Sequence, residues 1–275
     1  LIRTTDRIIL NDLLVRLDMT DDAEEGGGGR IAPSFWGVAG NPVSHSITPK
    51  LFSIVGERLG IRGVSSVSIQ ADDVAEFFRE TAEMEGDLWI SCTSPLKHAL
   101  SEYLGYQEGD RHGGINQIVR SEGRWSFVNT DGDGFMEACR HIGIDPVSST
   151  IRIRGGGSTA RSIAHAWSKA GGSICTELGR RALGEGPWSD SVIDSEEADI
   201  AIDLDALPGG GKSVDLKAGI QLSASYSENS STEDFAVMMV AAQHLVAWRS
   251  LFAPEMSADI PTLSELLAIL RDTMN

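Results

Sequence analysis

The sequence predicts an α/β protein with two domains. Strand-like and helix-like segments alternate from residue 35 onward, an order typical of parallel sheets covered by helices. A second run of such segments begins near residue 150 and carries its own glycine-rich turn. The chain has 275 residues, and at roughly 100–200 residues per domain this length suits two domains.

The first block, in chain order, alternates short apolar runs with segments of helical periodicity. Three predicted helices have recognisable starts: Thr48-Pro49 opens one, Asp72 is a candidate N-cap for the next, and Pro95 begins the third. A turn at SEGR joins two further strands. The predicted elements are strand 35–40, helix 48–60, strand 64–69, helix 72–84, strand 87–92, helix 95–105, strands 114–119 and 125–129, and helix 133–143.

The second block begins with a strand, a glycine-rich turn, a helix and a strand over residues 150–178, which is one βαβ unit. A later strand is expected within 198–207, and two long apolar helices end the chain. Ahead of both blocks, residues 1–19 have an amphipathic helical pattern and 21–29 read DDAEEGGGG, a flexible linker. Residues 1–30 are therefore expected to be an appendage.

The charge of the chain argues against a nucleic-acid partner. The formal net charge is −17, and a polyanion would be repelled by that field. An anionic small-molecule substrate would then need a local cationic group. No run of about 18 apolar residues is seen, so no membrane partner is expected.

The cysteines and the start of the chain give an expectation for the cellular compartment of the protein. Cys92, Cys139 and Cys175 are odd in number and widely spaced, which disfavours a disulfide framework and favours a reducing, cytoplasmic location. None belongs to a Cys-x-x-Cys pair, so no metal site is expected. Charged residues interrupt the first 17 positions, which is unlike a secretory signal.

A glycine-rich turn in the second block predicts a dinucleotide site. Gly155, Gly157 and Ala160 fit G-x-G-x-x-A directly after a strand and at the start of a helix. The glycines permit a tight turn and close approach of a pyrophosphate, which then faces the helix N-terminus at Ser158 and Thr159. The alternative is a glycine-rich loop without a ligand.

The next strand ends on residues that bear on the form of the dinucleotide. Arg180 and Arg181 offer donors for the 2′-phosphate of NADP. Glu177, inside the strand, is a competing candidate for the acid that reads the ribose of NAD. A solvated pair of arginines without a ligand remains the other interpretation.

Polar residues cluster at the strand ends of the first block: Ser44–Pro49, Thr93–Lys97, Asn116 and Asn129–Asp131. Ligands of open α/β sheets bind outside the carboxyl ends of the strands. Hydroxyls, amides, one lysine and one aspartate together suit a polyhydroxylated carboxylate, with the lysine able to hold an anion or move a proton. Taken singly, each residue is better explained as a helix cap or a turn residue than as a ligand.

Six motifs occur in order over residues 35–250: GNPVSHSITPKLF, SCTSPLK, GGINQIV, VNTDGDGF, GGGSTAR and AAQ in the last long helix. In their order and spacing these motifs resemble the shikimate dehydrogenase family. The resemblance implies two α/β domains, an open substrate domain and a Rossmann-like nucleotide-binding domain, with the last helices returning to the first. It also implies reduction of 3-dehydroshikimate to shikimate with NADPH, in chorismate and aromatic amino acid biosynthesis.

The resemblance assigns roles residue by residue. Lys97 and Asp131 match the family's catalytic pair, and Arg180 matches the arginine of its cofactor signature. His45 is expected to be structural. The substrate-binding positions are Ser46, Thr48, Thr93, Asn116 and Gln243. The cofactor-binding positions are Gly155, Gly157, Ser158, Thr159, Ala160, Arg180 and Arg181.

Departures from the family pattern are concentrated in the cofactor half. Ser91 stands where an asparagine is usual, Arg154 where a hydrophobic residue is usual, and Gly179 replaces an asparagine. Residues 198–210, ADIAIDLDALPGG, lack the family's Asn-Ala-Thr segment, and Ala236 and Met238 stand where glycines usually approach the nicotinamide.

Three functions therefore stay open: an NADP-dependent shikimate dehydrogenase, a shikimate-binding paralogue with impaired cofactor binding, and a quinate or shikimate dehydrogenase that uses NAD. The expected domains are 1–30 as appendage, 31–135 plus 234–275 for substrate and catalysis, and 136–233 for NADP. A homodimer is left open.

Overall fold

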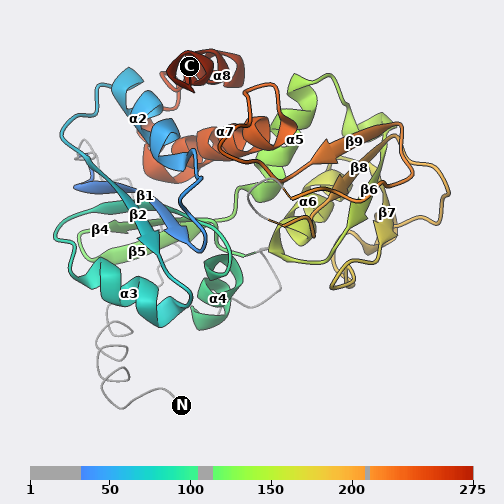
Figure 1. The fold of residues 1–275 in the computed structure, drawn as a ribbon, viewed down its shortest axis with the longest axis horizontal. Coiled ribbons are helices and arrows are strands. Elements are labelled where there is room, and N and C mark those ends of the chain that lie inside the picture. The colour runs from blue at the N-terminus through green and yellow to red at the C-terminus, as the bar shows by residue number, and fades with distance from the viewer. Residues whose placement is uncertain (1–31, 105–113, 208–210, 275) are drawn as a thin grey trace.

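The computed structural model describes residues 32–104, 114–207 and 211–274. The predicted appendage, residues 1–30, and the end of the helix predicted at 95–105 lie outside the described residues. Figure 1 shows two α/β bodies side by side, each built around one sheet. The predicted fold class is confirmed.

The first sheet has five strands in the order β2-β1-β3-β4-β5. Its strands are β1 (Phe35–Gly40), β2 (Ser65–Gln70), β3 (Leu88–Cys92), β4 (Gln117–Ser121) and β5 (Arg124–Val128). Helices α2 (Thr48–Arg58), α3 (Val74–Ala82), α4 (Leu96–Tyr103) and α5 (Asp131–His141) belong to the same part of the chain. Strand β3 is buried along its whole length because helices cover both of its faces.

This sheet is mixed, whereas the alternation of elements predicted a mostly parallel one. Strands β1, β2 and β3 run parallel, but β4 is antiparallel to both β3 and β5. The two-residue turn between β4 and β5 accounts for the antiparallel pairing of these two strands, since so short a connection joins only antiparallel strands. Glu122 and Gly123 both have positive φ, 51° and 78°, as the favoured hairpin turn requires.

The N-cap of α3 also differs from the prediction. Asp73, not Asp72, precedes the helix and accepts a hydrogen bond from the backbone N–H of Glu76 at 2.8 Å. Asp72 lies one residue outside and accepts from Asn41 Nδ2 at 2.6 Å. Both positions carry the same side chain, so composition alone does not distinguish them.

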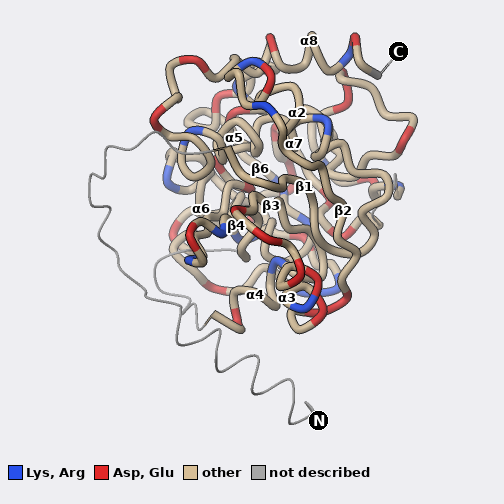
Figure 2. Tube along the Cα trace, turned by 90° about the vertical axis from the view of Figure 1, so that its left-hand side faces the viewer, with Lys and Arg blue, Asp and Glu red and all other residues tan. Residues whose placement is uncertain are grey.

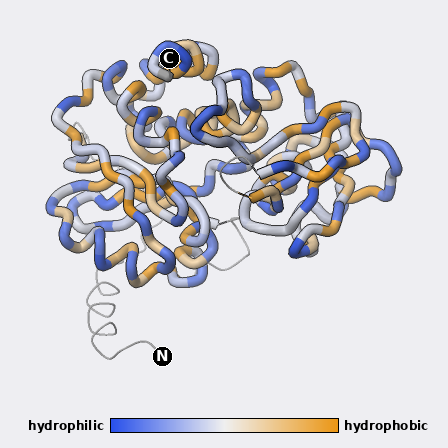
Figure 3. Tube along the Cα trace, in the orientation of Figure 1, coloured by the Kyte–Doolittle hydropathy of each residue, from blue (hydrophilic) through white to orange (hydrophobic). Residues whose placement is uncertain are grey.

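The second sheet has four parallel strands in the order β7-β6-β8-β9. These are β6 (Thr150–Arg154), β7 (Ser173–Glu177), β8 (Ile200–Asp203) and β9 (Ile220–Ser223). Helix α6 (Ser158–Lys169) follows the glycine-rich turn and buries one face, on which Ala160, Ile163, Ala164 and Trp167 recur at helical spacing. The orange segments in the centre of both bodies in Figure 3 mark these apolar strands and helix faces.

The last helices return to the first sheet, as the resemblance implied. Helix α7 (Phe235–Ala247) packs on α5 and α2, and α8 (Leu263–Met274) packs on α2 and α7. An aromatic cluster holds this return in place: Trp248 lies 5.3 Å from Trp89 and 6.0 Å from Phe52, measured between ring centroids. Burial of such a ring contributes about 2–3 kcal/mol.

One helical stretch of the described chain, Phe235–Phe252, has the length and apolar composition of a membrane span. Its residues are 72% buried inside the protein. A core helix passes the same test, and α7 with the π-helical turn Trp248–Phe252 occupies the centre of the core.

Candidate active site

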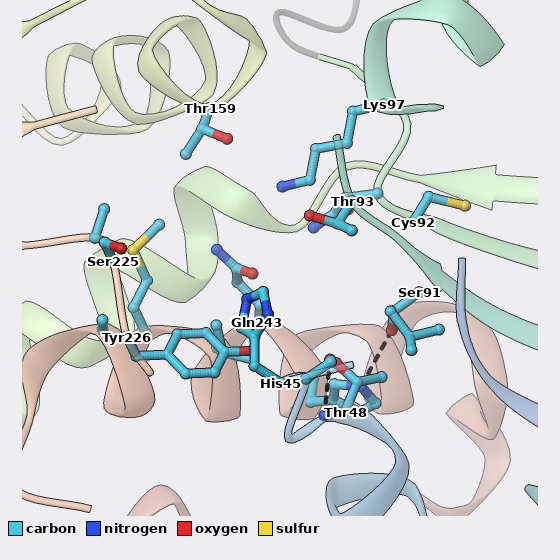
Figure 4. Close-up of a pocket in the computed structure, with 18 of the residues that line it drawn as sticks. His45, Thr48, Ser91, Cys92, Thr93, Lys97, Thr159, Ser225, Tyr226 and Gln243 are labelled. Carbon is cyan, nitrogen blue, oxygen red and sulfur yellow. Dashed lines mark hydrogen bonds between the residues drawn. The ribbon is translucent and has the colours of Figure 1, made fainter. Parts of the chain in front are cut away.

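A cavity of about 250 Å³ lies between the carboxyl ends of the first sheet, helix α7 and the loops after β8 and β9. Every predicted substrate-binding residue lines it, together with Lys97; Asp131 stands directly behind Lys97. In Figure 4 the side chains of Lys97, Thr93, Gln243 and Tyr226 surround one space. The residues are Ser46, Thr48, Thr93, Lys97, Asn116 and Gln243.

Lys97 and Asp131 form a close ion pair at the wall of this cavity. Lys97 Nζ donates to both carboxylate oxygens of Asp131 at 2.8 Å. The aspartate side chain is fully buried, whereas the lysine is 20% exposed. Asn116 Nδ2 donates to Asp131 Oδ1 at 2.9 Å. The carboxylate is thus fixed, and the ammonium is the group that a ligand can reach.

Asp131 occupies its position because of the turn that precedes α5. Asn129 Oδ1 accepts from the backbone N–H of Asp131 at 3.0 Å, and Asn116 Oδ1 accepts from Thr130 N at 2.8 Å. Gly132 donates its backbone N–H to Ser162 Oγ on α6 at 2.9 Å. A Cβ at Gly132 would lie 2.4 Å from the carbonyl oxygen of Ser162, so glycine permits this close contact between the two helices.

Gln243 reaches the cavity from α7 because a glycine lies opposite it. A Cβ at Gly134 of α5 would fall 2.4 Å from Gln243 Cγ and 2.6 Å from its backbone nitrogen. The close packing of the two helices therefore places an amide at the cavity wall. Thr93 is held in place by a backbone hydrogen bond instead, since its N–H donates to the carbonyl oxygen of Ala39 at 2.8 Å.

Ser46 and Thr48 lie at the start of α2, where their hydroxyls line the cavity. The backbone N–H of Thr48 donates to Ser46 Oγ at 3.3 Å. Tyr226 lies beside them, and its ring meets His45 edge-on at 5.7 Å between centroids. Burial raises the pKa of the Tyr226 phenol, although hydrogen bonds with Ser46 and with the backbone of Ile47 act in the opposite direction.

A buried polar group at the cavity floor was not predicted from sequence. Ser91 Oγ lies 2.6 Å from Gln117 Oε1, which only accepts, so the Ser91 hydroxyl must donate its proton there. The contact of 3.1 Å between Ser91 Oγ and His244 Nε2 therefore requires a proton on Nε2. Burial lowers the pKa of His244 to about 3, which keeps the ring neutral. His244 sits beside Phe52, ring to edge, at 4.6 Å between centroids.

A second cavity of about 470 Å³ adjoins the first and shares Lys97 and Thr159 with it. Six of the seven predicted cofactor residues line it: Gly157, Ser158, Thr159, Ala160, Arg180 and Arg181. Gly155 lies behind them with φ of +101°, which glycine adopts readily. Helix α6 begins here after Gly157, where an added Cβ would meet open space.

These features test whether a dinucleotide fits. An uncovered glycine, a helix N-terminus and two arginines around one cavity suit a pyrophosphate and an adenosine phosphate. Two contacts restrict the fit: the carbonyl oxygen of Ala182 would lie 1.9 Å from a Cβ at Gly156, and Asp205 pairs with Arg180. The residues of a dinucleotide-binding turn therefore line this cavity, and Ala182 and Asp205 occupy part of its edge.

Arg154, a departure from the family pattern, has a partner on the neighbouring strand. Arg154 at the end of β6 lies opposite Asp203 of β8 and pairs with it, with Arg154 Nη1 2.9 Å from Asp203 Oδ1. Burial would raise the pKa of Asp203, but hydrogen bonds from Val214 N–H, Arg154 and Asp205 N–H together lower it. The unusual arginine is thus neutralised by an aspartate of β8.

Several site residues escaped sequence reasoning because their signal is weak. Tyr226 lies in a polar loop, His244 is a single histidine in an apolar helix, and Asp203 ends a strand. For His244 the position directly after Gln243 was a usable signal. Met238, singled out for crowding the nicotinamide, does not line either cavity, whereas Ala236 lines the first.

The geometry is that of a two-domain α/β protein with a lysine–aspartate pair at the junction of two cavities, one of them beside a glycine-rich turn. No family model matches the chain. The chain is 31% identical over 144 residues to a shikimate dehydrogenase (NADP(+)) of Thermus thermophilus, covering 49% of this chain and 51% of the relative. It is 33% identical over 152 residues to that of Acidiphilium cryptum, covering 54% and 55%. These alignments span about half the length of the curated relatives.

The same fold occurs in solved structures. One is shikimate 5-dehydrogenase of Thermus thermophilus in complex with NADP(H) and shikimate, with a TM-score of 0.65, 21% identity, and coverage of 86% of this chain and 98% of that one. Another is an Ael1 enzyme from Pseudomonas putida, with a TM-score of 0.56, 14% identity, and coverage of 78% and 92%. The chain is thus similar in sequence to shikimate dehydrogenases over about half its length and shares their fold over most of it.

Proposed function

We propose that this chain is a shikimate dehydrogenase that interconverts 3-dehydroshikimate and shikimate with NADP(H). The observation that carries the proposal is the Lys97–Asp131 ion pair at the junction of the two cavities. The sequence relatives are named for this activity and this cofactor. We further propose the division of labour expected from sequence: residues 31–135 plus 234–275 for substrate and catalysis, and 136–233 for the cofactor.

The substrate cavity suits an anionic, polyhydroxylated ring. Lys97 is the one lysine or arginine among its described lining residues, so an anionic ligand finds its cation there. Ser46 and Thr48 offer hydroxyls to the carboxylate of the substrate. Gln243 offers an amide donor and acceptor to its ring hydroxyls, whereas Asn116, whose Nδ2 donates to Thr130 and Asp131, offers its carbonyl oxygen. Acidic residues outnumber basic ones along the chain (Figure 2). Their field repels an anion, so binding of an anionic substrate depends on the local positive charge of Lys97.

In the proposed reaction Lys97 is the acid and base. A bound dinucleotide supplies hydride to the carbonyl carbon or accepts it from the alcohol carbon. Lys97 Nζ gives a proton to the carbonyl oxygen as the alcohol forms and takes it back in oxidation. Asp131 orients the ammonium of Lys97 and stabilises its charge, and Asn116 holds the carboxylate of Asp131 in place. Thr93 and Gln243 position the ring of the substrate in this proposal.

Gly157, Ser158, Thr159 and Ala160 would face the pyrophosphate, and Arg180 and Arg181 the adenosine phosphate. Gly155 serves the turn itself. These assignments rest on the shared cavity and on the open space beside Gly157.

The test is an assay of two acids against two cofactors. Shikimate and quinate are each supplied with NADP⁺ and with NAD⁺, and reduction of the nicotinamide is followed by absorbance. We expect the fastest reduction with shikimate and NADP⁺. Faster turnover of quinate with NAD⁺ would replace the proposal with the third function that the sequence left open.

The second candidate is a shikimate-binding protein without turnover. The observation that favours it is the contact of Ala182 with Gly156, which narrows the approach to the glycine-rich turn. Shikimate binding, measured by tryptophan fluorescence or calorimetry, with no reduction of either dinucleotide by either acid would establish this alternative and refute the dehydrogenase.

A further inference from the structure

A carboxylate occupies the edge of the cofactor cavity where the arginines lie. Asp205 follows β8 and lines the cavity with Arg180 and Arg181. Its backbone N–H donates to Asp203 Oδ1 at 3.0 Å, which fixes the start of the loop. Its side chain lies against two glycines, since a Cβ at Gly179 would be 1.9 Å from Asp205 Oδ2 and one at Gly155 3.1 Å from Oδ1. The carboxylate therefore fills the gap between the ends of β6 and β7.

Asp205 also binds Arg180 twice. The backbone N–H of Arg180 donates to Asp205 Oδ2, and Arg180 Nη2 lies 3.4 Å from Oδ1. The side chain of Asp205 is only 11% exposed, whereas that of Arg180 is 71% exposed. The aspartate is thus the fixed partner, and the guanidinium is the group free to turn toward a ligand.

This arrangement has a consequence for the 2′-phosphate of a dinucleotide. The phosphate would share Arg180 with a carboxylate already in place, and the two like charges repel each other. A ribose that carries only hydroxyls meets no such repulsion, because a carboxylate accepts hydrogen bonds from hydroxyls. Sequence reasoning placed the possible acid at Glu177, but Glu177 does not line the cavity.

We propose that Asp205 is a specificity-determining residue, which competes with the 2′-phosphate for Arg180 and weakens the preference for the phosphorylated dinucleotide. The proposal rests on the proposed function, in that it takes the second cavity to be the cofactor site. Asp205 touches neither the substrate cavity nor the Lys97–Asp131 pair. Its effect is therefore confined to the choice between the two forms of the cofactor.

The test measures binding by the full chain, not turnover. The probes are adenosine 2′,5′-bisphosphate and 5′-AMP, followed by NADP⁺ and NAD⁺, with dissociation constants from calorimetry. Asp205→Asn removes the charge and keeps an acceptor for Arg180 N–H. We expect it to tighten binding of the 2′-phosphorylated probes about tenfold, the effect of one neighbouring charge, and to change the others less than about threefold.

Three variants control the result. Asp259→Asn makes the same charge change on an exposed loop before α8 and is expected to leave all four constants unchanged. Arg180→Ala added to Asp205→Asn should cancel the gain. Asp205→Thr removes the charge by a different side chain and replaces Asp205→Asn if that variant does not fold.

Equal tightening for both classes of probe, or none, overturns the proposal. Failure of adenosine 2′,5′-bisphosphate to bind either the native chain or Asp205→Asn overturns it as well. The dehydrogenase proposal fails separately, in the assay of shikimate and quinate with both cofactors, so the two failures are distinguishable.

Discussion

Thr159 Oγ1 donates a hydrogen bond to Asp131 Oδ2 at 2.9 Å, which joins the first turn of α6 to the buried carboxylate of the proposed catalytic pair. Sequence reasoning assigned Thr159 to the cofactor. The structure places it at both cavities and on Asp131. Together with Lys97 and Asn116, it completes four hydrogen bonds to the two carboxylate oxygens. The orientation of the proposed acid thus depends on the helix that follows the glycine-rich turn.

Thr159→Val keeps the shape of the side chain and removes this hydrogen bond. We expect kcat for shikimate oxidation to fall about tenfold, equivalent to about 1.4 kcal/mol, because Asp131 then holds Lys97 less firmly. KM for shikimate should change little, since Thr159 offers no contact that the substrate requires. Steady-state kinetics of Thr159→Val and Thr159→Ser measure this. Recovery of kcat in the serine variant is required, and a loss that serine does not restore would assign Thr159 to packing.

Lys97→Ala should abolish most turnover while substrate binding persists. Loss of a positioned acid lowers kcat by about 10²–10⁴-fold. Ser46 and Thr48 remain to hold the carboxylate and Gln243 the ring, so the dissociation constant of shikimate, although raised by loss of the cation, should rise by less than kcat falls. The two quantities are measured by steady-state kinetics and by fluorescence titration. Lys50→Ala, an exposed lysine of α2, is the matched control. An unchanged kcat in Lys97→Ala contradicts the role proposed for this residue.

The sequence was sufficient for the elements and for residues whose neighbours in the chain identify them. Strand–helix alternation located both sheets, and the turn after β6 located the second cavity. It was insufficient for pairings across space. Arg154 was recognised as a departure and Asp203 was not singled out, and only the register of β6 against β8 shows that they face each other.

The polar floor of the substrate cavity illustrates the same limit. Ser91, Gln117 and His244 come from three elements, β3, β4 and α7, and their contacts depend on the packing of α7 against the sheet. A histidine in an apolar helix carries no sign of its partner. Asp205 is similar, because its importance comes from glycines on two other strands' ends.

The pairing of Arg154 with Asp203 predicts a measurable coupling. Asp203→Asn leaves the largely buried arginine without its partner and should lower the free energy of unfolding by about 2–3 kcal/mol. Arg154→Val alone should also destabilise, because Asp203 is then a buried charge without a cation. The double variant removes both charges together and should lose less than the sum, with a coupling of about 1–2 kcal/mol.

Urea denaturation of the native chain, both single variants and the double variant supplies this cycle. The control is the exposed pair of Arg79 and Glu76 on α3, 3.2 Å apart, whose coupling should stay below about 0.5 kcal/mol. Additive losses at Arg154 and Asp203 would show that the two side chains do not stabilise each other.

The buried imidazole of His244 is expected to lower the free energy of unfolding in mild acid. Burial lowers the pKa of its imidazole to about 3, whereas the unfolded chain has a value near 6.5. The unfolded state therefore binds a proton first as pH falls, and the stabilisation that the neutral ring supplies above pH 6.5 is lost progressively toward pH 3. The slope approaches about 1.4 kcal/mol per pH unit, or about 2 kcal/mol between pH 6.5 and 5. This window lies above the range in which Asp203 titrates, since its pKa is lowered from 3.8.

Urea denaturation at several pH values between 5 and 7.5 measures the slope that His244 is expected to cause. His244→Gln should flatten it, while His98→Gln, an exposed histidine of α4, should leave it unchanged. An equal slope in the native chain and His244→Gln would mean that another group titrates in this range and that the His244 ring accepts its proton without unfolding.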